Sequence, residues 1–286
     1  MHEGFAIFIL THGRADKVYT HETLRKAGYS GPIYIVIDNE DKCGDEYRKK
    51  YGDKVLVFDK DKVAREIDEA DNFDISRKSI VYARNAVWQI ARDLGFRYFM
   101  QMDDDYVGFE YRYKSDGQGC YYAVRKTMDK AIDALLHFFK SVPALSIAMA
   151  QGGDLIGGTQ NTPLHLKRKA MNSFICDTHN SFTFCGRINE DVNAYTMLSR
   201  MGHLFFTVMQ IKLVQKQTQS NAGGMTGIYE DTGTYLKTFY TVMHCPSCVK
   251  VGVMGDHHFR IHHEIDWNAT APRILSENHK KAGAKT

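Results

Sequence analysis

Long hydrophobic runs are absent from this chain of 286 residues. Its longest apolar stretches, such as residues 5–10 and 142–150, fall well short of the roughly 18 residues that a membrane-spanning helix needs. The N-terminus carries Glu3 where a signal peptide carries positive charge, so we expect no secretion signal. These absences exclude an integral membrane protein and lead us to expect a cytoplasmic one.

Cysteine and proline are both sparse. Six cysteines are too few for a disulfide scaffold in a chain of this length, and they favour a reducing compartment. Five prolines and no low-complexity run leave no obvious linker between domains. Hydrophobic residues make up 43% and charged residues 25% of the chain, a globular balance that argues against disorder. We therefore expect a single domain over residues 1–286.

Charge is distributed unevenly along the chain. Residues 1–110 hold 17 Lys and Arg against 21 Asp and Glu, whereas residues 111–286 hold 20 against 13. The first half is therefore biased toward cations as partners and the second half toward anions.

Strands and helices alternate in the first hundred residues. Continuous apolar runs at 5–10, 33–37 and 55–58 predict buried strands, and polar stretches at 16–27 and 45–51 predict the helices between them. Short loops joining such elements are typical of parallel βαβ units. The sequence therefore predicts an α/β fold with a mostly parallel sheet flanked by helices.

The pattern becomes less regular beyond residue 110. Before that point, a helix capped by Ser76 and ended by Gly95 leads into a strand over 96–102. Beyond it, we expect helices over 121–140 and 191–201, and strands over 145–150, 204–208 and 249–254.

Three consecutive aspartates, Asp103, Asp104 and Asp105, follow the strand at 96–102. Adjacent like charges raise one another's pKa, and a divalent cation such as Mg²⁺ or Mn²⁺ relieves the repulsion. Alternation sends Asp103 and Asp105 to one side and Asp104 to the other. Because ligands of open α/β sheets bind beyond the carboxyl ends of the strands, we predict a metal site at Asp103 and Asp105.

Four features of the chain, in this order, resemble a GT-A glycosyltransferase, a Rossmann-like fold. They are Thr11-His-Gly-Arg14 after the first strand, Asp38 ending the second, Arg84-Asn85 in a helix, and Met102-Asp-Asp-Asp105. More narrowly, the chain resembles the phage and bacterial TET-associated glycosyltransferases, which are proposed to glycosylate hydroxymethylated pyrimidines in DNA. That resemblance rests on the same motifs together with Asp38-Asn-Glu-Asp41 and the histidine-rich segment near residue 260.

The resemblance implies a UDP-sugar donor, Mn²⁺ or Mg²⁺ as cofactor, and DNA carrying 5-hydroxymethylpyrimidines as acceptor, in the cytoplasm of a bacterial host. Residues 1–110 would hold the nucleotide sugar and the metal, and residues 111–286 the acceptor. The nucleotide-sugar contacts that it implies are Thr11, His12, Arg14, Asp38, Arg84, Asn85, Asp103, Asp104 and Arg260.

An acidic pair, Glu190 and Asp191, opens the helix expected over 191–201. The helix dipole alone favours acids at this position. In GT-A enzymes a pair at this distance beyond the metal motif approaches the acceptor hydroxyl. If the transfer inverts the anomeric centre, one carboxylate removes the acceptor proton, with Asp191 as first choice and Glu190 as second. In a retaining enzyme the pair would orient the acceptor.

The segment Asp256-His-His-Phe-Arg-Ile-His-His263 holds four of the thirteen histidines. GT-A enzymes often bring a C-terminal histidine back to the metal, which makes His258 and His262 the candidate ligands. If the segment is extended, both share a face with Arg260, which would neutralise the leaving group. A polar edge strand is the structural alternative. The nearby Cys245-Pro-Ser-Cys248 has no assigned role.

Residues 159–220 hold seven Lys and Arg against three acids, including Lys167, Arg168 and Lys169 in a row. Phe174, Phe182 and Phe184 follow, either as core residues or as partners for an unstacked base. We expect the three cations to bind DNA. The alternatives are a protein or glycan acceptor, a sugar nucleotidyltransferase, and a non-catalytic nucleic-acid-binding module.

Overall fold

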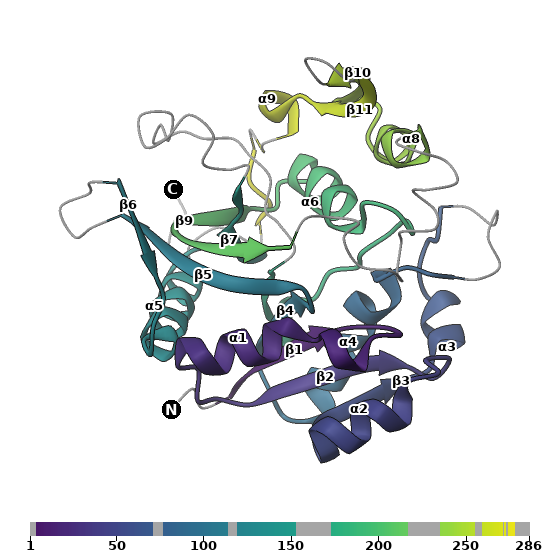
Figure 1. Cartoon of the computed structure of the whole chain (residues 1–286). Coiled ribbons are helices and arrows are strands. Elements are labelled where there is room, and N and C mark those ends of the chain that lie inside the picture. Colours follow the sequence, from purple (N-terminus) through teal and green to yellow (C-terminus); the bar gives the residue numbers. More distant parts are fainter. Residues whose placement is uncertain are drawn as a thin grey trace.

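The computed structural model describes residues 4–70, 77–113, 119–152, 173–216, 235–254, 259–270, 272 and 274–277. Within them a nine-stranded sheet has the order β3-β2-β1-β4-β8-β7-β9-β5-β6 (Figure 1). The strands are β1 (Phe5–Leu10), β2 (Ile33–Asp38), β3 (Val55–Phe58), β4 (Tyr98–Asp103), β5 (Tyr106–Tyr113), β6 (Gly119–Ala123), β7 (Ser146–Ala150), β8 (Ile175–Asp177) and β9 (Phe205–Gln215).

Two kinds of pairing divide this sheet. Strands β3, β2, β1 and β4 pair in parallel, and so do β7 and β9. Strands β5, β6 and β8 pair antiparallel with their neighbours. All six residues of β1 are buried, as its continuous apolar run predicts for a strand covered on both faces. The predicted α/β fold with a less regular second half is confirmed.

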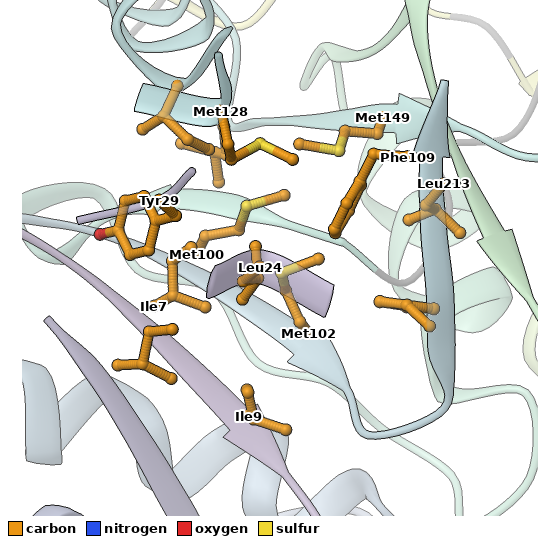
Figure 2. Close-up of a cluster of buried hydrophobic side chains, with 14 of the residues drawn as sticks. Ile7, Ile9, Leu24, Tyr29, Met100, Met102, Phe109, Met128, Met149 and Leu213 are labelled. Carbon is orange, nitrogen blue, oxygen red and sulfur yellow. The ribbon is translucent and has the colours of Figure 1, made fainter. Parts of the chain in front are cut away.

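Helices cover both faces of the sheet (Figure 1). One layer contains α1, α2 and α5 and the other α3, α4 and α6. Figure 2 shows part of the core of the first layer, where Ile7 and Ile9 of β1 lie near Leu24 of α1. The helices are α1 (Tyr19–Ala27), α2 (Gly44–Tyr51), α3 (Lys60–Ala64), α4 (Val81–Asp93), α5 (Met128–Ser141), α6 (Glu190–Arg200), α8 (Tyr235–His244) and α9 (Trp267–Thr270), with short 3-10 turns at Ala15–Lys17, Gly52–Lys54 and Thr178–Asn180.

The predicted helix over 121–140 is wrong at its start. Strand β6 occupies residues up to 123, and α5 begins only at Met128. Tyr122 pairs with Tyr111 across the β5–β6 ladder, so pairing with the preceding strand overrides the local helical pattern. Elsewhere the expected boundaries shift: α4 begins at Val81, and β9 continues to Gln215 rather than ending at 208. Ser76, the predicted cap, lies outside the described residues.

A second sheet of two strands, β10 (Val249–Met254) and β11 (Arg260–Ile265), is separate from the large one (Figure 1). Its base packs on α6, because Val249 and Ile265 share a hydrophobic cluster with Met197. The buried thiols of Cys245 and Cys248 belong to the same cluster. None of the helices in the described parts of the chain is long and apolar enough to cross a membrane.

Candidate active site

The aspartate run forms a turn between β4 and β5 that the first turn of α1 holds in place. The Thr20 hydroxyl donates to the carbonyl oxygen of Asp103 at 2.6 Å and accepts from the backbone N–H of Tyr106 at 2.9 Å. The Thr20 backbone N–H donates to the carbonyl oxygen of Asp104 at 3.1 Å. Because these three bonds bracket the turn, the three aspartate side chains start from a fixed backbone.

Asp104 points into the polar groups that follow β1. Its Oδ2 accepts from the Thr11 hydroxyl at 2.6 Å and lies 2.9 Å from Nε of Arg14. The hydroxyl of Tyr47, from α2, lies 2.9 Å from that of Thr11 and accepts from the Arg14 backbone N–H at 3.0 Å. Burial raises the pKa of Asp104, and Arg14 offsets part of that rise. This network orders the segment that carries Thr-His-Gly-Arg.

The side chain of Asp105 has fewer polar partners than that of Asp104 in the described part of the chain. Its Oδ2 accepts from the side-chain amide of Gln215 at 3.0 Å, at the end of β9. Its Oδ1 is shielded from solvent and has no hydrogen-bond partner among the described residues. Burial, together with the nearby charge of Asp103, raises the pKa of Asp105 to about 7. A carboxylate of this kind is stabilised by an additional cation.

Arg84 of α4 joins the aspartate run to the acidic pair. Its Nη2 donates to Oδ1 of Asp103 at 2.8 Å and its Nε to Oε1 of Glu190 at 2.9 Å. The side chain is 1% exposed, so both ion pairs are shielded from water. Two carboxylates that lie 87 positions apart in the sequence are thereby held around one guanidinium.

The two acids of the pair differ in their surroundings. Glu190 is buried, and burial, followed by the charge of Asp191, raises its pKa to about 7 even though Arg84 opposes the shift. Asp191 is half-buried, and its Oδ1 accepts from the backbone N–H of Val192. Both occupy the first turn of α6, where the helix dipole favours negative charge.

Asp38, at the end of β2, is fully engaged by its neighbours. His12 Nδ1 donates to its Oδ2 at 2.7 Å, and Nζ of the buried Lys60 lies 3.0 Å from its Oδ1. Burial alone would raise the pKa of Asp38, but the hydrogen bonds from His12 and Lys60 outweigh it and lower the pKa. The more exposed His12 ring is therefore the part of this cluster that a ligand can reach.

Asn85 is occupied by backbone groups. Its side-chain amide donates to the carbonyl oxygens of Val81 and Phe184, and its Oδ1 accepts from the Phe184 N–H at 3.0 Å. It fastens the segment before the acidic pair to α4, and a nucleotide contact for it stays a prediction.

Several predicted residues are not brought into this site. Among the described residues no three His, Cys, Asp or Glu side chains lie close enough to hold one metal ion, so His262 is not brought to Asp103 and Asp105. Arg260 is exposed on β11, with Nη2 3.4 Å from the Met254 sulfur. Phe174, Phe182 and Phe184 are core residues, which rules out their role in base stacking. His258, Lys167, Arg168 and Lys169 lie outside the described residues.

Four residues of the site were not predicted from the sequence: Thr20, Tyr47, Lys60 and Gln215. Each is polar or amphipathic, and Thr20, Tyr47 and Lys60 are buried. A threonine inside a helix carries no local signal when its partners are 83 and 86 residues away, and neither does Gln215, whose partner is 110 residues away.

A family model described as TET-Associated Glycosyltransferase matches residues 5–224. The chain belongs to this family. The resemblance that the motifs predicted is therefore confirmed, and this TET-associated glycosyltransferase is an enzyme of the glycosyltransferase class. No curated protein matches the chain significantly.

Solved structures resemble this TET-associated glycosyltransferase only distantly. Glucosyl-3-phosphoglycerate synthase from Mycobacterium tuberculosis, with Mn²⁺, UDP and phosphoglyceric acid, has 7% identity and a TM-score of 0.46, covering 91% of this chain and 86% of that one. A mannosyltransferase from Pyrobaculum calidifontis, with GDP-Man and Mn²⁺, has 11% identity and a TM-score of 0.46, covering 85% and 63%. S. aureus TarS residues 1–349, with UDP-GlcNAc, has 12% identity and a TM-score of 0.43, covering 85% and 66%.

Proposed function

We propose that this TET-associated glycosyltransferase moves a sugar from a UDP-sugar to the hydroxyl group of a 5-hydroxymethylpyrimidine in DNA, with the help of a divalent metal. The observation that carries the proposal is the buried Arg84, which binds Asp103 at 2.8 Å and Glu190 at 2.9 Å. A group-transfer site needs its donor-binding and acceptor-activating groups next to each other. Arg84 links the two sets of carboxylates that these roles require.

The carboxylate oxygens of the aspartate turn are suitable ligands for a hard divalent cation. Asp105 Oδ1 is shielded from solvent and has no hydrogen-bond partner in the described part of the chain, and its pKa is raised to about 7 by burial and by Asp103. Asp103 and Asp105 would hold Mn²⁺ or Mg²⁺ through carboxylate oxygens. When bound, the metal would neutralise the diphosphate of the leaving nucleotide.

Nucleotide binding is proposed for the groups around the ends of β1 and β2. His12 is 40% exposed and its Nδ1 is held by Asp38, which leaves the other ring nitrogen for the base or the ribose. Arg14 is fixed by Asp104 and would contribute positive charge toward the phosphates. Nη1 of Arg84 has no hydrogen-bond partner among the described residues and would be a further donor to the diphosphate.

Proton transfer is proposed for Asp191. In an inverting transfer the anomeric carbon loses its bond to the diphosphate oxygen and gains one to the acceptor oxygen, whose proton passes to a carboxylate. Glu190 is committed to Arg84, whereas Asp191 is half-buried at the start of α6 and stays within reach of an acceptor. In a retaining transfer Asp191 would orient the hydroxyl instead.

The DNA acceptor rests on the family and on the excess of positive charge in residues 111–286. A base inside a duplex would have to be flipped out before its hydroxymethyl group could meet the sugar. Lys167, Arg168 and Lys169 remain the proposed backbone contacts.

The test is incubation with a panel of nucleotide sugars, Mn²⁺ or Mg²⁺, and DNA containing 5-hydroxymethylpyrimidines, followed by digestion to nucleosides and mass spectrometry. A hexose added to the modified nucleoside, with UDP released in equal amount, is the expected result. Release of diphosphate with a nucleotide joined to the product would indicate a nucleotidyltransferase. Donor turnover only with protein or glycan acceptors would overturn the DNA assignment and keep the glycosyl transfer.

A further inference from the structure

Asn189, the residue before the acidic pair, has an unusual conformation. Its φ of 57° and ψ of 35° lie in the left-handed region, which glycine enters freely and asparagine tolerates better than most residues. An asparagine that caps a helix normally accepts a hydrogen bond from the first turn of that helix, and Asn189 makes no such bond. A backbone conformation of this kind persists where the surrounding contacts hold it in place.

The side chain of Asn189 is bound by helix α8. Its Nδ2 donates to the carbonyl oxygen of Lys237 at 2.6 Å and to the Thr241 hydroxyl at 3.0 Å. Lys237 and Thr241 lie four positions apart and therefore on one face of α8. Because Asn189 is 8% exposed and Thr241 is fully buried, water is poorly placed to replace either bond. The Asn189 amide thus ties the start of α6 to α8.

Helix α8 also packs closely on the segment that leads to Asn189. Gly186 has a φ of 78°, and a Cβ built on it would lie 2.7 Å from Nε2 of His244, the last residue of α8. On the α4 side, the Ser79 hydroxyl donates to the carbonyl oxygen of Arg187 at 2.6 Å. The chain that enters α6 is therefore held between the segment before α4 and helix α8.

The backbone at Asn189 sets the start of the helix that carries the two acids. Its carbonyl oxygen accepts from the Asn193 N–H at 2.8 Å, and Glu190 and Asp191 lie between these two residues. Arg84 fixes the carboxylate of Glu190, whereas Asp191 Oδ1 is bound by the backbone N–H of its neighbour in the helix. The direction of the Asp191 side chain therefore depends on the backbone of this first turn.

We propose that Asn189 is a positioning residue, through which α8 fixes the acidic pair for glycosyl transfer. The inference rests on the proposed function, because it takes Asp191 as the group that acts on the acceptor hydroxyl. Helix α8 lies beyond residues 5–224, which the family model matches, so the inference gives a role to a part of the chain outside that match. A displacement of about 1 Å at a reacting group can lower turnover about 10²-fold.

The test changes the bond from the α8 side and leaves both acids in place. Thr241→Val keeps the shape of the side chain and removes the hydroxyl, whereas Thr241→Ser keeps the hydroxyl. We expect Thr241→Val to lower kcat for sugar transfer about 10-fold with an unchanged KM for the UDP-sugar. Thr241→Ser should stay within about twofold of the parent. Parental kcat in Thr241→Val would overturn the proposal.

A core substitution in the other helix layer is the matched control. Ile132, in α5, is fully buried, and Ile132→Val should lower the melting temperature by a few degrees, as loss of one buried hydrogen bond does. It should keep parental kcat. A loss of kcat in Ile132→Val as large as in Thr241→Val would reduce the effect to general destabilisation and overturn the proposal.

Asn189→Gly separates the backbone of this residue from its side chain. Glycine adopts the left-handed conformation freely but loses both bonds to α8, so kcat should fall by about 10- to 100-fold. Because Thr241→Val acts through Asn189, it should have no further effect on kcat in the Asn189→Gly background. Losses of kcat that multiply in the double variant would contradict the proposal.

Hydrogen exchange provides a readout that needs no substrate. Amides in a peptide covering residues 190–196 should exchange at least about fivefold faster in Thr241→Val than in the parent, and at the parental rate in Ile132→Val. If the parent transfers no sugar to hydroxymethylated DNA, the proposed function has failed. The exchange rates then decide the inference alone: faster exchange in Thr241→Val supports the link between α8 and the acidic pair, and parental exchange overturns it.

Discussion

Asp38 and Asp105 lie at the same edge of the sheet, at the ends of strands separated only by β1, yet their surroundings are opposite. Asp38 is bound by His12 and Lys60, which lower its pKa. In the described part of the chain the neutral amide of Gln215 is the one hydrogen-bond donor to the Asp105 carboxylate, and burial and Asp103 raise the pKa of Asp105 to about 7. The first carboxylate is satisfied by the protein, and the second needs a cation from solution.

The largest effect is expected on turnover, when the carboxylate of Asp105 is removed. Asp105→Ala should lower turnover by at least about 10³-fold, because a metal supplies several kcal/mol of charge stabilisation to the leaving group. Circular dichroism and thermal melting should show an intact fold. Asp45→Ala, at a fully exposed acid on α2, is the matched control and should keep parental turnover. Full activity in excess chelator would contradict the metal assignment.

Removing the carboxylate of Asp38 is expected to lower the stability of the fold. Asp38→Ala leaves the buried Lys60 with the half-exposed Glu40 as its one ion-pair partner among the described residues, so the unfolding free energy at pH 7 should fall by about 3 kcal/mol. Because the folded pKa of Asp38 lies below its usual value of 3.8, its contribution is present above that pH and is lost as pH falls through the folded pKa. Urea titrations at pH 7 and pH 3 measure both effects, and the difference between parent and variant should shrink at pH 3.

Glu190 and Asp191 differ in the same way: Glu190 is bound by Arg84, whereas Asp191 is only half-buried. Asp191→Asn should lower turnover by at least about 10²-fold with little change in donor affinity, the range for loss of a general base. Glu190→Gln should weaken donor binding as well, because it removes a partner of Arg84 and so disturbs Asp103. Steady-state kinetics with donor titration separates the two. Parental turnover in Asp191→Asn would remove this residue from the mechanism.

The smallest effect is a gain in stability. Asp105→Asn should raise the unfolding free energy of the metal-free protein by at least about 1 kcal/mol at pH 8, because it removes a buried charge next to Asp103. Since the folded pKa is raised from 3.8 to about 7, the ionised group costs stability progressively between those pH values and nothing below them. The gain should therefore vanish at pH 4, and thermal melts at both pH values check it.

Local patterns predicted the first half of the fold well. The buried strands predicted at residues 5–10 and 33–37 are continuous apolar runs, and their parallel pairing needs only the helices between them. Strand β5 was missed because it pairs with β9, a hundred residues away, and β6 was missed with it because β6 pairs with β5. A tyrosine-rich stretch therefore looked helical when considered alone.

The candidate site was predicted only in part for a related reason. Strand-end position marked Asp38 and Asp105 alike, since the sequence around both is a run of acids. What separates them is Lys60 and Gln215, which come from other elements and have no motif. Arg84 was expected to face the nucleotide, and its bridge between Asp103 and Glu190 could be seen only once α4 and α6 were placed.

The central claim is that Asp105 in the aspartate turn, and not Asp38 at the end of β2, binds the metal. Electron paramagnetic resonance of Mn²⁺ titrated with protein in the absence of nucleotide tests it directly, because bound Mn²⁺ loses the sharp signal of the free ion. We predict that the parent and Asp38→Asn deplete the free signal with similar affinity and that Asp105→Asn does not. Equal depletion by Asp105→Asn and the parent, or loss of binding only in Asp38→Asn, would contradict the account.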